Sequence, residues 1–138
     1  MDPDCIFCKI IAGEAPATRL YEDDATVCFL DIFPWARGHS LVVSKEHAET
    51  IYDLSESAAA ATMATVKIVA PILRDAVGAE GLNLLQANGR AAWQSVDHFH
   101  IHLVPRWFGD PLRPPGAPSP ADPDALKEIA ASFVERLS

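Results

Sequence analysis

Three histidines alternate with apolar residues in the run His98-Phe99-His100-Ile101-His102, and this alternation favours a β-strand. Because alternate side chains of a strand share a face, the three imidazoles would point one way, about 6.6 Å apart in succession. Phe99 and Ile101 would point into a core on the other side. A half-buried strand needs polar residues at such positions, but not histidine at every one. The run therefore predicts a functional site.

Two kinds of chemistry fit a row of imidazoles. In the first, the histidines bind a catalytic metal ion, because imidazole is a common zinc ligand. Metal hydrolases usually add carboxylate ligands, and here only Asp97 is adjacent, on the opposite face of the strand. In the second, one imidazole attacks phosphorus while the others bind phosphate oxygens and move protons. Neutral imidazole is a good nucleophile near pH 7, which favours the second interpretation.

The remaining pattern predicts an α+β domain with a mostly antiparallel sheet, because strands precede and follow one long helical segment. Asp4 can cap the first helix, Asp53-Leu54-Ser55-Glu56 resembles the start of the long one, and Asp122 precedes a proline at the first position of the last. The apolar stripe of the last helix should dock on another surface. We expect strands over residues 19–22, 26–31, 40–44, 81–87 and 98–105, and helices over 5–12, from 53 to about 77, and from 123 onward.

Length and charge restrict the protein further. The 138 residues suit one domain, with a core over residues 4–106 and a proline-rich tail and helix over 107–138. A net charge of -8 argues against nucleic acid as a partner but allows a mononucleotide in a locally positive pocket. No apolar stretch reaches the roughly 18 residues of a membrane span, so no membrane partner is expected. The acidic start, Met1 to Asp4, lacks the basic residues of an export signal and favours a cytoplasmic location.

Four segments in the right order resemble the histidine triad (HIT) family, over roughly residues 4–106. The triad motif itself is His98-Phe99-His100-Ile101-His102-Leu103-Val104. The other three are Cys5-Ile6-Phe7-Cys8-Lys9-Ile10-Ile11, Gly38-His39-Ser40-Leu41-Val42-Val43 and Leu82-Asn83-Leu84-Leu85-Gln86-Ala87-Asn88-Gly89. The resemblance implies a HIT-like fold, in which a long helix, an N-terminal helix and a C-terminal helix flank a five-stranded antiparallel sheet. It also implies a homodimer.

The resemblance assigns catalytic roles to histidines and to the segment before the triad. His100 matches the nucleophile, which attacks the α-phosphate of a purine nucleotide. His102 matches the third histidine, which binds phosphate, and His39 matches an upstream histidine that lies against the triad. Gln94 and Ser95 match residues that contact the phosphate and the leaving group. Such a cluster of donors would offset the negative charge of the phosphate.

Further positions match the family's nucleotide pocket. Asp31 matches the carboxylate that accepts hydrogen bonds from both ribose hydroxyls, as the fork of a carboxylate allows. Asn88 lies near the phosphate-facing position. Four apolar residues would flank the base, although each could equally be plain core: Phe7, Ile10, Phe29 and Ile32.

The pair Cys5-x-x-Cys8 alone could be redox-active or simply two buried thiols. Bacterial triad proteins of the zinc-binding type hold structural zinc with such a pair, a mid-chain histidine and the first triad histidine. The matching positions are Cys5, Cys8, His47 and His98, a complete Cys2His2 set. The resemblance thus implies structural zinc, and no catalytic cofactor, because protein atoms would fill all four positions.

The chain departs from the family at Trp93, where relatives usually have glycine, and in its proline-rich tail. Both departures bear on substrate choice. The sequence favours hydrolysis of purine nucleoside phosphoramidates or related adenylylated compounds through a nucleotidyl-histidine. The alternatives are a diadenosine polyphosphate hydrolase, a nucleotidyltransferase, a nucleotide-binding protein with little turnover, and a metal-dependent hydrolase.

Overall fold

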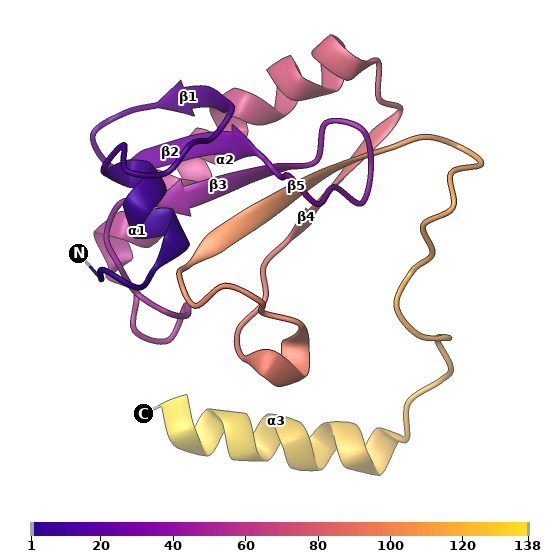
Figure 1. Ribbon diagram of the computed structural model, residues 1–138. Coiled ribbons are helices and arrows are strands. Elements are labelled where there is room, and N and C mark those ends of the chain that lie inside the picture. Colours follow the sequence, from indigo (N-terminus) through magenta and orange to yellow (C-terminus); the bar gives the residue numbers. More distant parts are fainter. Residues whose placement is uncertain (1, 138) are drawn as a thin grey trace.

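The computed structural model describes residues 2–137, and in this part of the chain one five-stranded antiparallel sheet forms the centre of the fold (Figure 1). The strand order is β1-β2-β3-β5-β4. The strands are Arg19–Glu22 (β1), Thr26–Leu30 (β2), Ser40–Ser44 (β3), Gly81–Leu85 (β4) and His100–Arg106 (β5). The helices are Ile6–Ile11 (α1), Glu56–Val77 (α2) and Pro123–Leu137 (α3), with a 3-10 turn at Arg90–Ala92 (η1). The predicted α+β class and five-stranded antiparallel sheet are confirmed.

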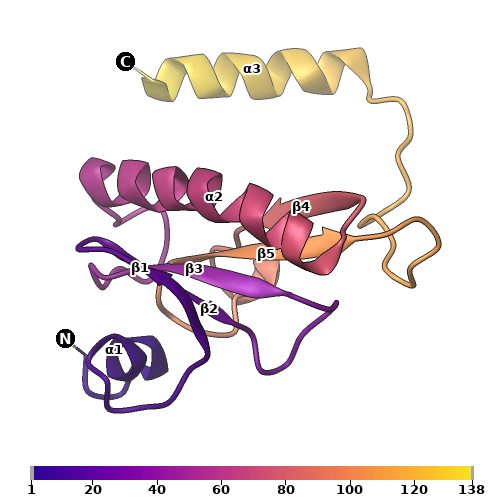
Figure 2. The same cartoon turned by 90° about the horizontal axis from the view of Figure 1, so that it is seen from above.

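The sheet separates two layers, with α2 on one face and α1 on the other (Figure 2). Strand β5 alternates between them as the sequence predicted. Its apolar residues Ile101 and Leu103 join the core beneath α2. On the other face, the ring of Phe7 from α1 lies 5.0 Å from the ring of His100. One face of the sheet therefore packs in the core beneath α2, and the opposite face carries the histidines.

Helix α2 is long and apolar enough, by length and composition, to cross a membrane, with a mean hydropathy of 1.3. It packs on the sheet through one flank, however, and its contacts are mainly with β3 and β5. The side chains buried on that flank are Thr62, Thr65, Val66, Val69 and Leu73. This packing makes α2 a core helix of the fold, and it leaves Ile68 and Ile72 exposed on a second flank.

Several predicted boundaries were wrong. Strand β2 ends at Leu30 rather than Asp31, β4 ends at Leu85 rather than Ala87, and β5 ends at Arg106 rather than Pro105. Cys5, not Asp4, caps α1, because its sulfur accepts a hydrogen bond from the Cys8 amide. Ser55, not Asp53, caps α2, because the Asp53 carboxylate is taken up by the turn before the helix. Strand β5 begins at His100, so His98 precedes the strand. The ring of Phe7 still contacts the rings of His98 and His100.

The segment after β5 leaves the sheet as an extended arm, residues 107–122, and ends in α3 (Figure 1). The start of α3 at Pro123 agrees with the prediction. None of its described residues is buried, so the expected docking of its apolar stripe is not met within the chain. Figure 2 shows α3 on the same side of the sheet as α2.

Candidate active site and metal centre

His100 and His102 line a cavity of about 450 Å³ on the α1 face of the sheet. Its walls come from α1, the end of β2, the loop after it and the segment before β5. Six other residues predicted from the sequence also line it: Phe7, Ile10, Phe29, Asp31, Ile32 and Ser95. The structure thus brings eight of the predicted nucleotide-site residues to one cavity. It is large enough for part of a small organic ligand.

The ring of His100 has a defined tautomer. Its Nδ1 lies 2.6 Å from the carbonyl oxygen of His98, so Nδ1 carries the hydrogen and donates it. The lone pair is therefore on Nε2. Burial lowers the pKa of His100 below its ordinary value, which keeps the ring neutral near pH 7. A neutral ring with one free nitrogen is the form that a nucleophile requires.

A chain of hydrogen bonds sets the neighbouring tautomers. The backbone amide of Trp35 donates to Nδ1 of His39 at 3.0 Å, so the proton of His39 is on Nε2. That Nε2 donates to Nδ1 of His102 at 2.9 Å. The remaining proton of His102 is therefore on its own Nε2. Burial lowers the pKa of His102 to about 4, so this ring is a neutral hydrogen-bond donor.

Asp31, His39 and His102 have ligand atoms that lie within 4.8 Å of one another and could form a metal group. The same series of hydrogen bonds argues against metal binding there. A metal ligand must offer a lone pair. The amide of Trp35 already occupies Nδ1 of His39, so its Nε2 carries a proton. We interpret this group as a hydrogen-bond network rather than a metal site.

Asp31 and three of the apolar residues predicted to flank the base also have structural roles. Asp31 is half-buried, and its Oδ1 accepts a hydrogen bond from the Phe33 amide at 2.8 Å. Its Oδ2 lies 3.6 Å from Nε2 of His39. The three buried apolar residues Phe7, Ile10 and Phe29 belong both to the core and to the cavity wall, so the two interpretations of them coincide. Ile32 is 81% exposed at the cavity rim.

Gln94 and Asn88 do not line the cavity. The amide oxygen of Gln94 accepts from the Gly89 amide at 2.7 Å, and its nitrogen donates to the carbonyl of Val96 at 3.0 Å. Asn88 is paired with the side chain of Gln86. These contacts hold the loop before β5 in shape. A direct contact of either side chain with phosphate remains a prediction from the resemblance.

Trp93, in this loop, has a φ of 74°, and it is the one non-glycine residue with positive φ among residues 2–137. The left-handed conformation costs an L-residue about 1 kcal/mol, and glycine avoids that cost. The side chain is 68% exposed, so little packing would be lost with it. We expect Trp93→Gly to raise the free energy of unfolding by about 1 kcal/mol in urea titrations. The neighbouring Ala91→Gly should lower it, and a destabilised Trp93→Gly variant would contradict this explanation.

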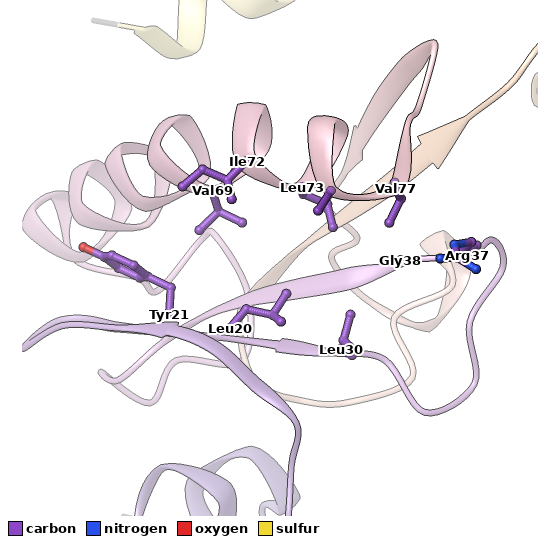
Figure 3. A pocket seen from close by; sticks show the side chains of 10 residues that line it. Leu20, Tyr21, Leu30, Arg37, Gly38, Val69, Ile72, Leu73 and Val77 are labelled. Carbon is purple, nitrogen blue, oxygen red and sulfur yellow. The ribbon is translucent and has the colours of Figure 1, made fainter.

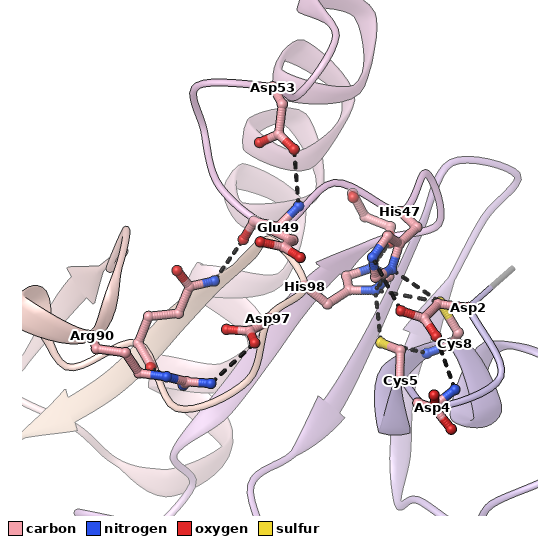
Figure 4. A network of polar contacts seen from close by, with 12 residues as sticks. Asp2, Asp4, Cys5, Cys8, His47, Glu49, Asp53, Arg90, Asp97 and His98 are labelled. Carbon is pink, nitrogen blue, oxygen red and sulfur yellow. Dashed lines mark hydrogen bonds and ion pairs between the residues drawn. The ribbon is translucent and has the colours of Figure 1, made fainter.

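The four predicted zinc ligands are brought together at the N-terminus of α1 (Figure 4). The sulfur of Cys5 lies 3.3 Å from Nδ1 of His98, and the sulfur of Cys8 lies 3.2 Å from Nδ1 of His47. The two Nδ1 atoms are 3.1 Å apart. In a tetrahedral zinc site with ordinary bond lengths, ligand nitrogens stand about 3.3 Å apart, and nitrogen and sulfur about 3.6 Å. The donor set and its spacing therefore fit zinc.

The contacts made by the second ring nitrogens of His98 and His47 also suit a metal. Nε2 of His98 donates to the carbonyl of Ser44 at 2.6 Å, which leaves the Nδ1 lone pair for the metal. A carboxylate oxygen of Asp2 lies 3.9 Å from Nε2 of His47. Burial raises the pKa of the Cys5 thiol, and a divalent cation would remove that resistance to ionisation. His98 thus connects the two sites: its ring faces the metal group and its carbonyl orients His100.

The lowered pKa of His102 predicts a pH dependence of stability. The unfolded chain takes up a proton near pH 6.5, while the folded ring takes it up only near pH 4. The free energy of unfolding should therefore fall as the pH drops through this window. In urea titrations at pH 7, 6 and 5, the free energy of unfolding should change less with pH in His102→Asn than in the native protein. An equal change with pH in the two proteins would contradict this prediction.

Sequence reasoning missed Trp35. Its ring stacks on His102 at a centroid distance of 5.0 Å and an interplanar angle of 13°, and it lies 4.9 Å from His39. It also lines the cavity. The one available signal was a large aromatic residue in a loop four residues before a site histidine.

Comparisons with known proteins identify the family of this chain. Residues 12–109 match the HIT domain family. The chain is 39% identical to an adenosine 5'-monophosphoramidase of Schizosaccharomyces pombe, over 96% of this chain and 98% of that protein. A crystal structure from Streptococcus mutans superposes with a TM-score of 0.95 at 35% identity, covering 100% of this chain and 88% of the other. A zinc-bound histidine triad family protein of Mycobacterium smegmatis has a TM-score of 0.76 at 35% identity, and 98% of each chain is covered.

The fold and the histidine-lined cavity define a nucleotide-binding or nucleotide-hydrolysing class of protein. The chain belongs to the histidine triad family.

Proposed function

We propose that the protein hydrolyses purine nucleoside phosphoramidates, or related adenylylated compounds, through a covalent nucleotidyl-histidine at His100. The observation that carries the proposal is the tautomer of His100, which leaves its Nε2 lone pair free in a ring that lines the cavity. The activity named for the Schizosaccharomyces pombe relative supports this choice of substrate. Asp31 would accept the ribose hydroxyls, and the apolar wall formed with Phe7 and Phe29 would hold the base.

The reaction balances in two displacements. First, Nε2 of His100 forms a bond to the α-phosphorus, and the bond from phosphorus to the leaving nitrogen breaks. Nε2–H of His102 donates to the phosphate, and the Nδ1–H bond from His100 to the His98 carbonyl stabilises the positive charge that develops on the ring. Water then attacks phosphorus, and the bond to Nε2 breaks. The leaving nitrogen takes a proton from solvent as its bond to phosphorus breaks. The water of the second displacement supplies the oxygen of AMP and returns a proton to solvent, so the two steps balance.

The metal group would have a structural role. Zinc bound by Cys5, Cys8, His47 and His98 would tie α1 to the segment that leads into β5, with no open coordination position for substrate. We further propose a homodimer in the cytoplasm with a purine nucleotide as the small-molecule partner, and no nucleic acid or membrane partner.

The choice of reaction is tested with the native protein and three ligands. We expect AMP release from adenosine phosphoramidate to have a higher kcat/KM than cleavage of diadenosine tetraphosphate. Binding of AMP is measured in parallel by calorimetry. Faster cleavage of the dinucleotide would favour the polyphosphate hydrolase, and AMP binding without turnover of either substrate would favour the binding protein.

A further inference from the structure

Helix α3 has an amphipathic surface that its own chain leaves uncovered. Its apolar residues follow one another at helical spacing, three and four positions apart. They are Leu126, Ile129, Phe133 and Leu137, each at least 56% exposed. Such spacing is typical of a helix that inserts one face into an apolar groove.

The same chain carries an apolar groove that is also uncovered. It lies between α2 and strands β1 and β2, and its volume is about 440 Å³ (Figure 3). Leu20 and Tyr21 form one wall, and Leu73 and Ile72 form the other. Ile72 at its rim is 65% exposed. Helix α3 and this groove therefore have matching apolar chemistry.

The arm holds α3 away from the groove of its own chain. Its root is fixed, because Arg106 forms two 2.8 Å hydrogen bonds with the carboxylate of Asp110. The indole of Trp107 also donates to the carbonyl of Gly78 at 2.8 Å. Beyond this root the arm is extended and stiff, since proline-rich segments act as semi-rigid spacers. Its prolines are Pro111, Pro114, Pro115, Pro118 and Pro120.

We infer that α3 is an exchanged arm: its apolar stripe occupies the α2 groove of a second copy of this chain. One chain carries both the helix and the groove, and the arm keeps them apart within that chain. A two-fold pair satisfies both at once, because each copy gives one helix and receives one. The structure from Streptococcus mutans superposes over all of this chain with a TM-score of 0.95, so its arm follows a similar course.

The exchanged arm would serve assembly rather than act as a lid over its own site. Figure 2 shows α3 on the α2 side of the sheet, whereas the histidine cavity is on the α1 side. The inference is thus independent of the proposed reaction and can be tested without a substrate.

The test joins two cysteines with a short bis-maleimide. Two full-length versions with different tags are co-expressed, one with Ile72→Cys in the groove and the other with Phe133→Cys on the stripe. The native cysteines are all buried. We expect a cross-linked pair that contains one chain of each kind. A matched control replaces Phe133→Cys with Ala131→Cys, which is exposed and lies about 160° around α3 from Phe133, and should cross-link at least tenfold less.

A second full-length chain with both substitutions, Ile72→Cys and Phe133→Cys, distinguishes the remaining arrangements. Exchange predicts a cross-linked product with twice the mass of the chain. A product with the mass of one chain, closed on itself, would show that α3 docks on its own groove and would overturn the inference. Absence of both products, with the protein folded by circular dichroism, would also overturn it.

Discussion

Replacing His100 with alanine is expected to lower AMP release from adenosine phosphoramidate by about 10⁴-fold or more, because the covalent route is lost with its nucleophile. Residual turnover would come from binding and phosphate stabilisation by the remaining site. The measurement is kcat/KM by chromatographic detection of AMP, with and without EDTA. Metal-independent turnover in the native protein would exclude the metal-dependent hydrolase, provided that the protein stays folded.

A matched variant separates chemistry from structure in this test. In His100→Asn, the amide nitrogen can still donate to the carbonyl of His98, as Nδ1 does at 2.6 Å in the native protein. The asparagine amide is not a useful nucleophile. We therefore expect His100→Asn to be as inactive as His100→Ala but closer to the native protein in thermal stability. Turnover within tenfold of native in either variant would contradict the role of His100.

Replacing Cys8 with serine is expected to remove zinc and to lower the free energy of unfolding on the order of 5 kcal/mol. Structural zinc supplies about 10 kcal/mol or more where a peptide cannot fold without it, and a smaller share is expected here because the sheet has its own core. Elemental analysis should find one zinc per native chain and almost none in the variant. Urea unfolding measures the loss of stability.

Cys28 provides the control for this experiment. It is also a fully buried thiol, but it lies in the core beneath α2, away from the metal group. Cys28→Ala should keep its zinc and lose only the stability expected of a small core truncation. If native protein contains no zinc, or if Cys8→Ser and Cys28→Ala are equally affected, the structural zinc site is wrong.

Loss of zinc should also reduce catalysis, because His98 belongs to both sites. Its ring contributes to the metal group, and its carbonyl accepts the hydrogen bond that fixes the tautomer of His100. A displaced His98 would leave His100 free to adopt the other tautomer. This explains why the first histidine of the run precedes the strand yet remains fully buried.

Much of the fold was predictable from sequence because short-range patterns decide it. The strands at residues 19–22 and 40–44 were predicted with their observed limits, since the first ends at the turn-forming pair Asp23-Asp24 and the second is an apolar, β-branched run after Gly38. The N-caps were harder. Asp4 and Asp53 are acceptable caps by residue type, but long-range contacts and turn geometry decided for Cys5 and Ser55.

The site shows the same difference between what short-range sequence patterns predict and what long-range contacts decide. The spacing of the histidines predicted a functional site on one face of a strand, and the resemblance to the family implied the residues of the cavity and of the metal group. Sequence could not reveal that the amide of Gln94 is taken up inside its loop, because this depends on how residues 89–96 turn. Nor could it place the ring of Trp35 on His102, because that contact joins a loop to a distant strand.

The central claim is that the reaction passes through two displacements at phosphorus, with His100 as the first nucleophile. The stereochemical course at phosphorus tests it most directly. An adenosine phosphoramidothioate with a single configuration at phosphorus is hydrolysed by the native protein in ¹⁸O-labelled water. Each in-line displacement inverts the configuration, so two displacements predict net retention in the labelled product. Net inversion would mean direct attack by water and would contradict a nucleotidyl-histidine intermediate.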